Sequence, residues 1–140
     1  MPTVEYPFSL DYKAVPGLGR MPAVEVVLKY AGHEARAVAV MDSGSALTVF
    51  GHEYALALGI PDVTVGRQQA ISTLGGGIDC YMFDVEMEIR VKEHSNRFQA
   101  QIGFFAGRVR RNILGRNIFF AHYQLGFHES QQVIHIRPED

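Results

Sequence analysis

The chain has 140 residues, a length that suits one domain, with a formal net charge of −2 and a sequence pI near 6.3. This charge does not favour nucleic acid or an anionic membrane surface as a partner, and no apolar run approaches the roughly 18 residues that span a bilayer. The single cysteine, Cys80, cannot form an internal disulfide, and the first residues lack the features of a signal peptide. We therefore expect a cytoplasmic protein that binds neither nucleic acid nor membrane.

The expected secondary structure is mainly β. Residues 1–20 are predicted to be an irregular or extended segment because Pro and Gly interrupt any period, and residues 21–137 are predicted to form the folded domain. A hairpin turn is expected at 31–34 and another turn at 93–96. Runs rich in Val, Ile, Leu, Phe and Tyr predict strands at 23–30, 35–41, 47–50, 70–74, 78–92, 97–105, 123–127 and 133–136.

Two short helices are predicted among these strands. Residues 51–58 favour a helix that Gly59 can close and Pro61 prevents from extending, and a second helix is expected at 118–123. Residues 63–70 favour no particular element. The pattern as a whole predicts an all-β fold of about eight or nine strands, a closed or partly open barrel or a sandwich.

The end of the strand at 78–92 alternates strictly between apolar and charged residues. This period of two predicts a half-buried strand with one face in the core. The predicted buried face carries Val85, Met87, Ile89 and Val91, and the predicted exposed face carries Asp84, Glu86, Glu88, Arg90 and Lys92.

Asp42 is the most informative candidate residue. It follows the apolar run at 38–41 and begins the triplet Asp42-Ser43-Gly44, where the chain must turn. A carboxylate next to the core costs free energy to ionise unless partners stabilise its charge. One interpretation is therefore a functional acid, and the other is a turn-forming aspartate that hydrogen-bonds its own backbone.

Three features, in order, point to a family. These are the apolar strand with Asp42-Ser43-Gly44, a glycine-tipped hairpin about 30 residues later at Gly75, Gly76 and Gly77, and a downstream run of five residues before a short helix. That run is Ile113, Leu114, Gly115, Arg116 and Asn117. The arrangement resembles the retroviral-type aspartic proteases, or retropepsins, and their bacterial single-domain relatives, across roughly residues 23–136.

The resemblance implies a barrel of the acid-protease type and a homodimeric endopeptidase in which each subunit contributes one aspartate. Two carboxylates a few ångströms apart cannot both ionise cheaply, so they share one proton. One of them acts as the general base toward a water, and the other acts as the general acid toward the scissile peptide. A peptide or protein substrate would bind in extended form beneath two flaps, and no cofactor is expected.

The resemblance also implies a role for each matching residue. Asp42 takes the catalytic position, Ser43 the hydroxyl that links the two loops across the dimer, and Gly44 the place where substrate backbone approaches. The glycines at 75–77 form the flap tip. Residues 113 and 114 pack behind the catalytic loop, and residues 115–117 support it.

The chain departs from the family pattern in two places. The retroviral arginine equivalent to Arg116 commonly pairs with an aspartate four residues after the catalytic one, but this chain has Ala46 there. Arg116 is therefore expected to bind a backbone carbonyl or an N-terminal acid. Residues 123–136 can also form a complete hairpin, which is closer to the lobe ending of pepsin-like enzymes, so the dimer sheet is expected to differ from the viral one.

Two other functions compete with hydrolysis. A catalytically inactive, dimeric peptide-binding or scaffolding module would retain the architecture with its aspartates misplaced. The phosphate-binding Asp-x-Gly-Ser loop of actin-like ATPases is a second rival, but it needs a longer, two-lobed chain. No metal site is expected, because the six histidines show no metal-ligand spacing.

Overall fold

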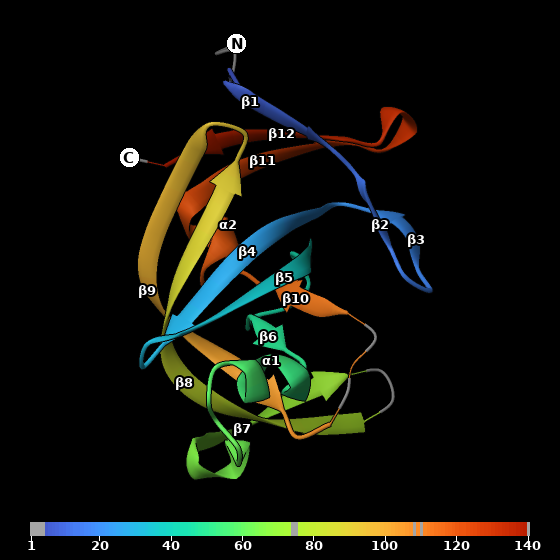
Figure 1. Cartoon of the computed structure of the whole chain (residues 1–140). Helices are drawn as coiled ribbons and strands as arrows, with labels where there is room; N and C mark the ends of the chain where they lie inside the picture. Colours follow the sequence, from blue (N-terminus) through green and yellow to red (C-terminus); the bar gives the residue numbers. More distant parts are fainter. Residues whose placement is uncertain (1–4, 74–75, 108, 110, 140) are drawn as a thin grey trace.

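The computed structural model describes residues 5–73, 76–107, 109 and 111–139 of the chain. These residues form a mainly β structure, so the all-β prediction is confirmed at the level of class (Figure 1). The described strands are β1 (Phe8–Asp11), β2 (Lys13–Val15), β3 (Gly19–Met21), β4 (Ala23–Tyr30), β5 (His33–Met41), β6 (Val49–Phe50), β7 (Arg67–Thr73), β8 (Gly76–Val91), β9 (His94–Phe105), β10 (Asn112–Leu114), β11 (Tyr123–His128) and β12 (Val133–Pro138).

The helices are short. They are α1 (His52–Ala57), α2 (Phe119–His122) and the single-turn 3₁₀ helices η1 (Val63–Val65) and η2 (Glu129–Gln131). As predicted, α1 is followed by Gly59 in the left-handed region at φ 78°, and Pro61 comes two residues later. No helix in the described part of the chain is long and apolar enough to cross a membrane.

The larger sheet has seven strands in the order β4-β5-β10-β6-β9-β8-β7, and β4 also pairs with β8. The 16-residue β8 makes both connections: its first half pairs with β7, and its second half pairs with β4, for example at Val26 and Ile89. A strand that changes partners along its length must curve, and β8 does so in Figure 1. This curvature carries the β7–β8 hairpin beyond the body of the sheet.

Two tight turns set the register of this sheet. Ala31 and Gly32 join β4 to β5 with φ angles of 49° and 84°, the combination that suits a two-residue hairpin. Lys92 and Glu93 join β8 to β9, with Lys92 at φ 53°. The prediction of a turn at 93–96 is therefore wrong, because β9 already begins at His94; no Gly or Asn marks the true turn.

The second sheet has the strand order β1-β12-β11. Its β11–β12 hairpin confirms the complete C-terminal hairpin expected from the sequence. Within residues 1–20, which were predicted to be irregular or extended, the described chain forms β1, β2 and most of β3. Phe8 pairs with Ile136 and Asp11 with Val133, partners so distant in sequence that local composition could not reveal them.

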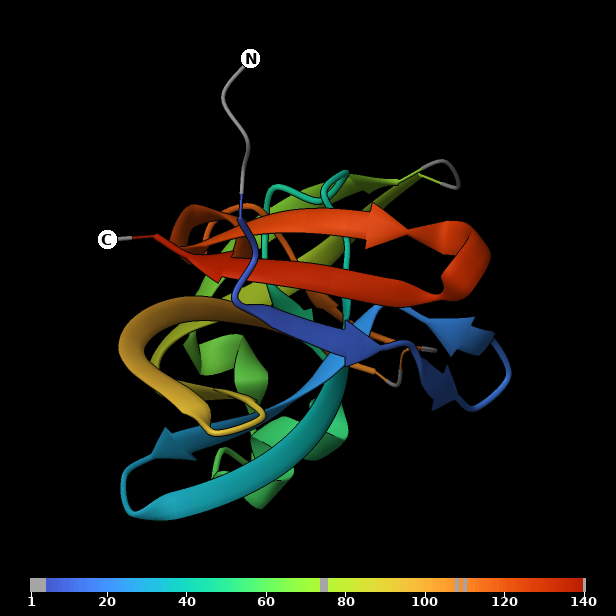
Figure 2. The same ribbon diagram turned by 90° about the horizontal axis from the view of Figure 1, so that it is seen from above.

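The seven-stranded and three-stranded sheets share one hydrophobic core, and β2 and β3 pair in a separate two-stranded sheet. Phe50 and Phe104 from the larger sheet belong to the same buried cluster as Phe119 and Tyr123, whose rings stack with centroids 4.8 Å apart. The core also includes Ile136 from β12. In Figure 1 the three-stranded sheet lies at the top and the β7–β8 hairpin at the bottom, and Figure 2 looks down onto the three-stranded sheet.

The apolar face predicted for β8 is confirmed. The opposite, charged face differs from the prediction at one residue. Glu88 was expected to be exposed, yet it is only 3% exposed. It accepts hydrogen bonds from Arg90 at 3.1 Å and Ser95 at 2.9 Å, and its Oε1 lies 3.5 Å from Nε of Arg97. These partners compensate the buried charge. The residues of the confirmed face are Val85, Met87, Ile89 and Val91.

Candidate functional site

Asp42 begins the loop that leaves β5. Its backbone N–H donates to the carbonyl of Leu114 at 3.0 Å, and its own carbonyl accepts from Ser45 at 3.1 Å. The half-buried carboxylate accepts the N–H of Gly44 on Oδ1 at 2.9 Å. Within the described residues Oδ2 has no hydrogen bond, so one oxygen holds the turn and the other is available for a ligand.

The bond from Gly44 is also what a simple turn-forming aspartate would make. Asp62 shows the same geometry, accepting the N–H of Thr64 at 3.0 Å, and the hydrogen bonds from Thr64 lower the pKa of Asp62. The local turn therefore fits both interpretations of Asp42. The Asp42 loop differs from the Asp62 turn in its surroundings, which include hydrogen bonds to the 114–117 segment and a neighbouring hollow.

Arg116 holds the Asp42 loop from outside. Its Nη1 donates to the carbonyl of Ser43 at 2.7 Å, and its backbone N–H donates to the carbonyl of Ser45 at 2.9 Å. The expectation of a backbone carbonyl partner, in place of an acid at Ala46, is confirmed. Arg116 thus fixes the loop on both sides of Gly44 without bringing a second carboxylate near Asp42.

Thr48 ties the same loop to the downstream motif. It is fully buried, accepts the N–H of Gly115 at 3.0 Å and donates its hydroxyl proton to Asn117 at 2.8 Å. Thr48 was not among the predicted site residues. A hydroxyl inside the apolar run at 47–50 does indicate that a buried side chain needs a hydrogen-bond partner. Gly115 is required here, because a Cβ would overlap the carbonyl of Leu47.

β10 brings Ile113 and Leu114 into register with the end of β5. It pairs in parallel with β5 and antiparallel with β6, where Ile113 lies opposite Val49. Leu114 is fully buried behind the loop, while Ile113 is partly buried and lines a hollow on the other side. The structure therefore brings the segments 42–44 and 113–117 together, as the resemblance implies.

That hollow has a volume of about 350 Å³. The Asp42 loop contributes Ser45 and β10 contributes Ile113, while the β7–β8 hairpin contributes Ile71 and Ile78. The hollow thus lies between the Asp-Ser-Gly loop and the hairpin. Its full lining is Leu18, Ser45, Val49, Ile71, Ile78, Phe105, Val109, Arg111 and Ile113.

The structure describes two of the three glycines that were predicted to form the flap tip. Gly75 lies outside the described residues. Gly76 and Gly77 are the first residues of β8 and pair with Thr73 and Ser72, so they belong to the strand that follows the hairpin loop. The hairpin reaches the hollow through its isoleucines.

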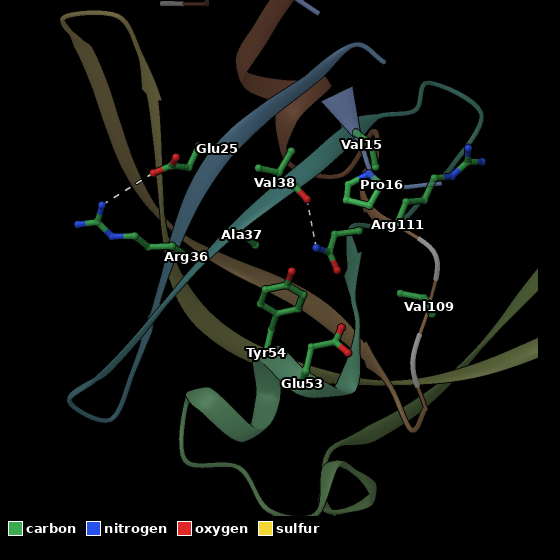
Figure 3. Close-up of a pocket in the computed structure, with 11 residues that line it drawn as sticks. Val15, Pro16, Glu25, Arg36, Ala37, Val38, Glu53, Tyr54, Val109 and Arg111 are labelled. Atoms are coloured by element: carbon green, nitrogen blue, oxygen red, sulfur yellow. Dashed lines mark hydrogen bonds and ion pairs between the residues drawn. The ribbon is translucent and has the colours of Figure 1, made fainter. Parts of the chain in front are cut away.

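A second hollow, of about 550 Å³, lies between α1 and the outer side of β5 (Figure 3). Glu25 and Arg36 face each other at its edge at 3.9 Å, and Tyr54 and Glu53 border it from α1. Val109 and Arg111 line both hollows, so these two residues lie between them. The second hollow carries charges of both signs, whereas the described residues that line the first include a single charged one, Arg111.

Other reactive groups lie elsewhere in the fold. Cys80 is fully buried, with its Sγ 3.9 Å from the sulfur of Met82, and burial raises the pKa of its thiol. Among the described residues no group of three or more His, Cys, Asp or Glu side chains could hold a metal ion. Asp42 is therefore the candidate reactive group that combines a braced loop with a neighbouring hollow.

No protein-family model and no curated protein sequence matches this chain. The function must therefore be inferred from the geometry of the Asp42 loop and from the motifs that resemble the retropepsins.

Proposed function

We propose that this protein is an aspartic endopeptidase that acts as a homodimer, with one Asp42 from each subunit. The observation that carries the proposal is the position of Asp42: it follows a buried strand, its loop is hydrogen-bonded to the 114–117 segment, and Ser45 of the same loop lines an apolar hollow. A turn aspartate without a function needs neither the bracing nor the hollow.

The strand pairings support the acid-protease type of barrel as part of this proposal. Pairing runs from β4 through β5, β10, β6, β9 and β8, and the additional β4–β8 pairing returns to β4. A sheet that returns to its first strand has the connectivity of a closed barrel. The β7–β8 hairpin extends from this ring and lines the hollow with Ile71 and Ile78, which supports its assignment as the flap within this proposal.

The chemistry requires two subunits, because the chain contains one Asp-Ser-Gly triplet. Ser43 and Gly44 are exposed, so a second copy can approach the loop and bring its own Asp42 near. The paired carboxylates would share one proton. The ionised member takes a proton from the attacking water while the other polarises the peptide carbonyl and then protonates the leaving amine.

The experiment that tests this function compares Asp42→Asn with Asp62→Asn in peptide-library cleavage from acidic to neutral pH. Asparagine can still accept the N–H two residues on, so both variants keep their turns and lose only an ionisable group. We expect Asp42→Asn to lower the cleavage rate by at least about 100-fold, the scale of a lost acid–base catalyst, and Asp62→Asn to leave it unchanged.

Wild-type protein that is folded, dimeric and binds peptides but cleaves none of them would instead support the inactive peptide-binding module. Cleavage that persists in purified Asp42→Asn would assign the activity to another residue or to a contaminant. Either result would overturn the proposed endopeptidase.

A further inference from the structure

We propose that Arg111 selects peptides that carry a carboxylate near an apolar side chain, with the apolar group in the hollow beside the Asp42 loop. The inference rests on the proposed function for the identity of the ligand as a peptide. It goes beyond that function by naming a specificity-determining residue and the chemistry of the substrate it favours.

The hollow is suited to an apolar side chain. Ile71 and Ile78 form the wall that comes from the β7–β8 hairpin, and Phe105 and Ile113 come from β9 and β10. Ile78 is 45% exposed, so a ligand that covers it removes apolar surface from water, which is favourable by roughly 25 cal/mol per Å². A volume near 350 Å³ can hold a large aliphatic or aromatic side chain together with part of the peptide backbone.

Among the described residues of this lining, Arg111 is the one that carries a charge. Its side chain is exposed, and within the described part of the chain it makes no hydrogen bond or ion pair. In Figure 3 its guanidinium group points away from Tyr54 and Glu53, although Arg111 also lines the second hollow. A guanidinium group with unused donors favours a carboxylate, which it can bind through two parallel hydrogen bonds.

The spacing of Arg111 and Ile113 sets where the carboxylate should lie. Arg111 immediately precedes β10 and Ile113 is the second residue of that strand, and both line the same hollow. In an extended peptide, side chains two positions apart lie on one face, roughly 6–7 Å from each other. If the apolar residue of a peptide contacts Ile113, an acidic residue two positions along the same peptide would therefore lie near Arg111.

The second hollow does not offer the same selection. Arg36 there lies 3.9 Å from Glu25, so an incoming carboxylate would meet an acidic group beside the cation. Like charges at close range disfavour binding. We therefore assign the preference to Arg111 and use Arg36 as its control.

The test measures binding separately from cleavage. In the Asp42→Asn background, fluorescence anisotropy follows short labelled peptides that carry a central leucine and either Glu or Gln two positions before or after it. Each peptide is made with a free and an amidated C-terminus, which separates a side-chain carboxylate from a terminal one. We expect one Glu series to bind about fivefold more tightly than its Gln counterpart, the upper range for an exposed ion pair.

Arg111→Gln should abolish this difference, Arg111→Glu should reverse it toward peptides with Lys at the same position, and Arg36→Gln should leave it intact. Thermal unfolding would confirm that each variant is folded. Three results would overturn the inference. They are a preference for Glu that survives Arg111→Gln, a preference that is lost in Arg36→Gln, and the absence of any peptide binding.

The two proposals fail separately. Acid-selective binding that depends on Arg111 in a protein that cleaves nothing would remove the endopeptidase and leave the specificity residue. Cleavage by wild-type protein with no preference between Glu and Gln peptides would do the opposite.

Discussion

Glu88 illustrates how the partners of one residue decide its place in the sheet. Its carboxylate is nearly inaccessible, although Glu86 and Arg90, two positions to either side on the same strand face, are partly or fully exposed. The hydrogen bonds from Arg90 and Ser95, together with the charges of Arg90 and Arg97, lower the pKa of Glu88 from 4.5 to about 2. Glu88 is therefore ionised in the folded protein over almost the whole pH range.

This shift predicts a specific loss of stability in acid. Because the pKa of Glu88 is lower in the folded state than in the unfolded chain, its ionised form stabilises the fold above the unfolded value near 4.5. That contribution should disappear progressively as the pH falls from about 4.5 to about 2. Chemical denaturation over this range should show Glu88→Gln less stable than wild type at neutral pH, with the difference closing in acid.

Glu86→Gln is the matched control, because Glu86 lies on the same strand and forms no ion pair among the described residues. It should retain the wild-type fall in stability below pH about 4.5. A Glu88→Gln protein that keeps the full acid sensitivity would show that other carboxylates cause it.

At the scale of elements, the junction between β10 and the Asp42 loop holds the candidate site together. The end of β10 passes so close to the loop that Gly115 has no room for a side chain, and a Cβ there would also lie 2.8 Å from the carbonyl oxygen of Ser45. Backbone atoms on both sides cannot rotate away as side-chain ends can. The position of Asp42 therefore depends on a close approach between two backbones.

Gly115→Ala should for this reason destabilise the protein by roughly 1–3 kcal/mol, the range for overpacking a well-filled site. Gly107→Ala is the control, because a Cβ at Gly107 would meet nothing within 4 Å. Urea denaturation of both variants gives the comparison. Equal stability of Gly115→Ala and wild type would mean that the loop can move away from β10 at no cost, and the bracing argument would fail.

At the scale of the whole molecule, the proposed activity belongs to two chains. The exposed Ser43 and Gly44 leave the Asp42 loop accessible, and the three-stranded sheet leaves β11 with one edge unpaired among the described strands. An unpaired strand edge is a ready surface for another chain, including a second copy. Dimer formation, however, remains a proposal.

The homodimer predicts that activity depends steeply on protein concentration. When most of the protein is monomeric, mass action makes the rate rise about fourfold for each doubling of concentration. Analytical ultracentrifugation at the same concentrations should show the dimer fraction rising in parallel. A rate strictly proportional to concentration in a sample that sediments as monomer would contradict the shared site.

Much of the local structure was predictable from the residues alone. The alternation along β8 predicted its buried face, and the helix formers before Gly59 and Pro61 predicted α1. Both patterns report preferences that act over a few residues: the period of two in a strand and the backbone angles that end a helix. For the same reason the β4–β5 and β11–β12 hairpins were placed correctly.

Features that join distant segments were not predictable in this way. The pairing of β1 with β12, the burial of Glu88 and the bond from Gly115 to Thr48 depend on partners brought together only by the fold. The turn at Lys92 was also misplaced, because a lysine in the left-handed region carries no compositional mark.

The candidate site divides along the same line. The residues alone indicate that Asp42 ends an apolar strand at a turn and that the 113–117 motif is present, because strand pattern and motif order are local properties. The bond from Arg116 to the carbonyl of Ser43, and the place of Arg111 in the hollow with the hairpin isoleucines, emerge from the fold, because those contacts depend on register and on how β8 curves. Periodicity specifies which face of an element is buried, while packing selects the partner that each face meets.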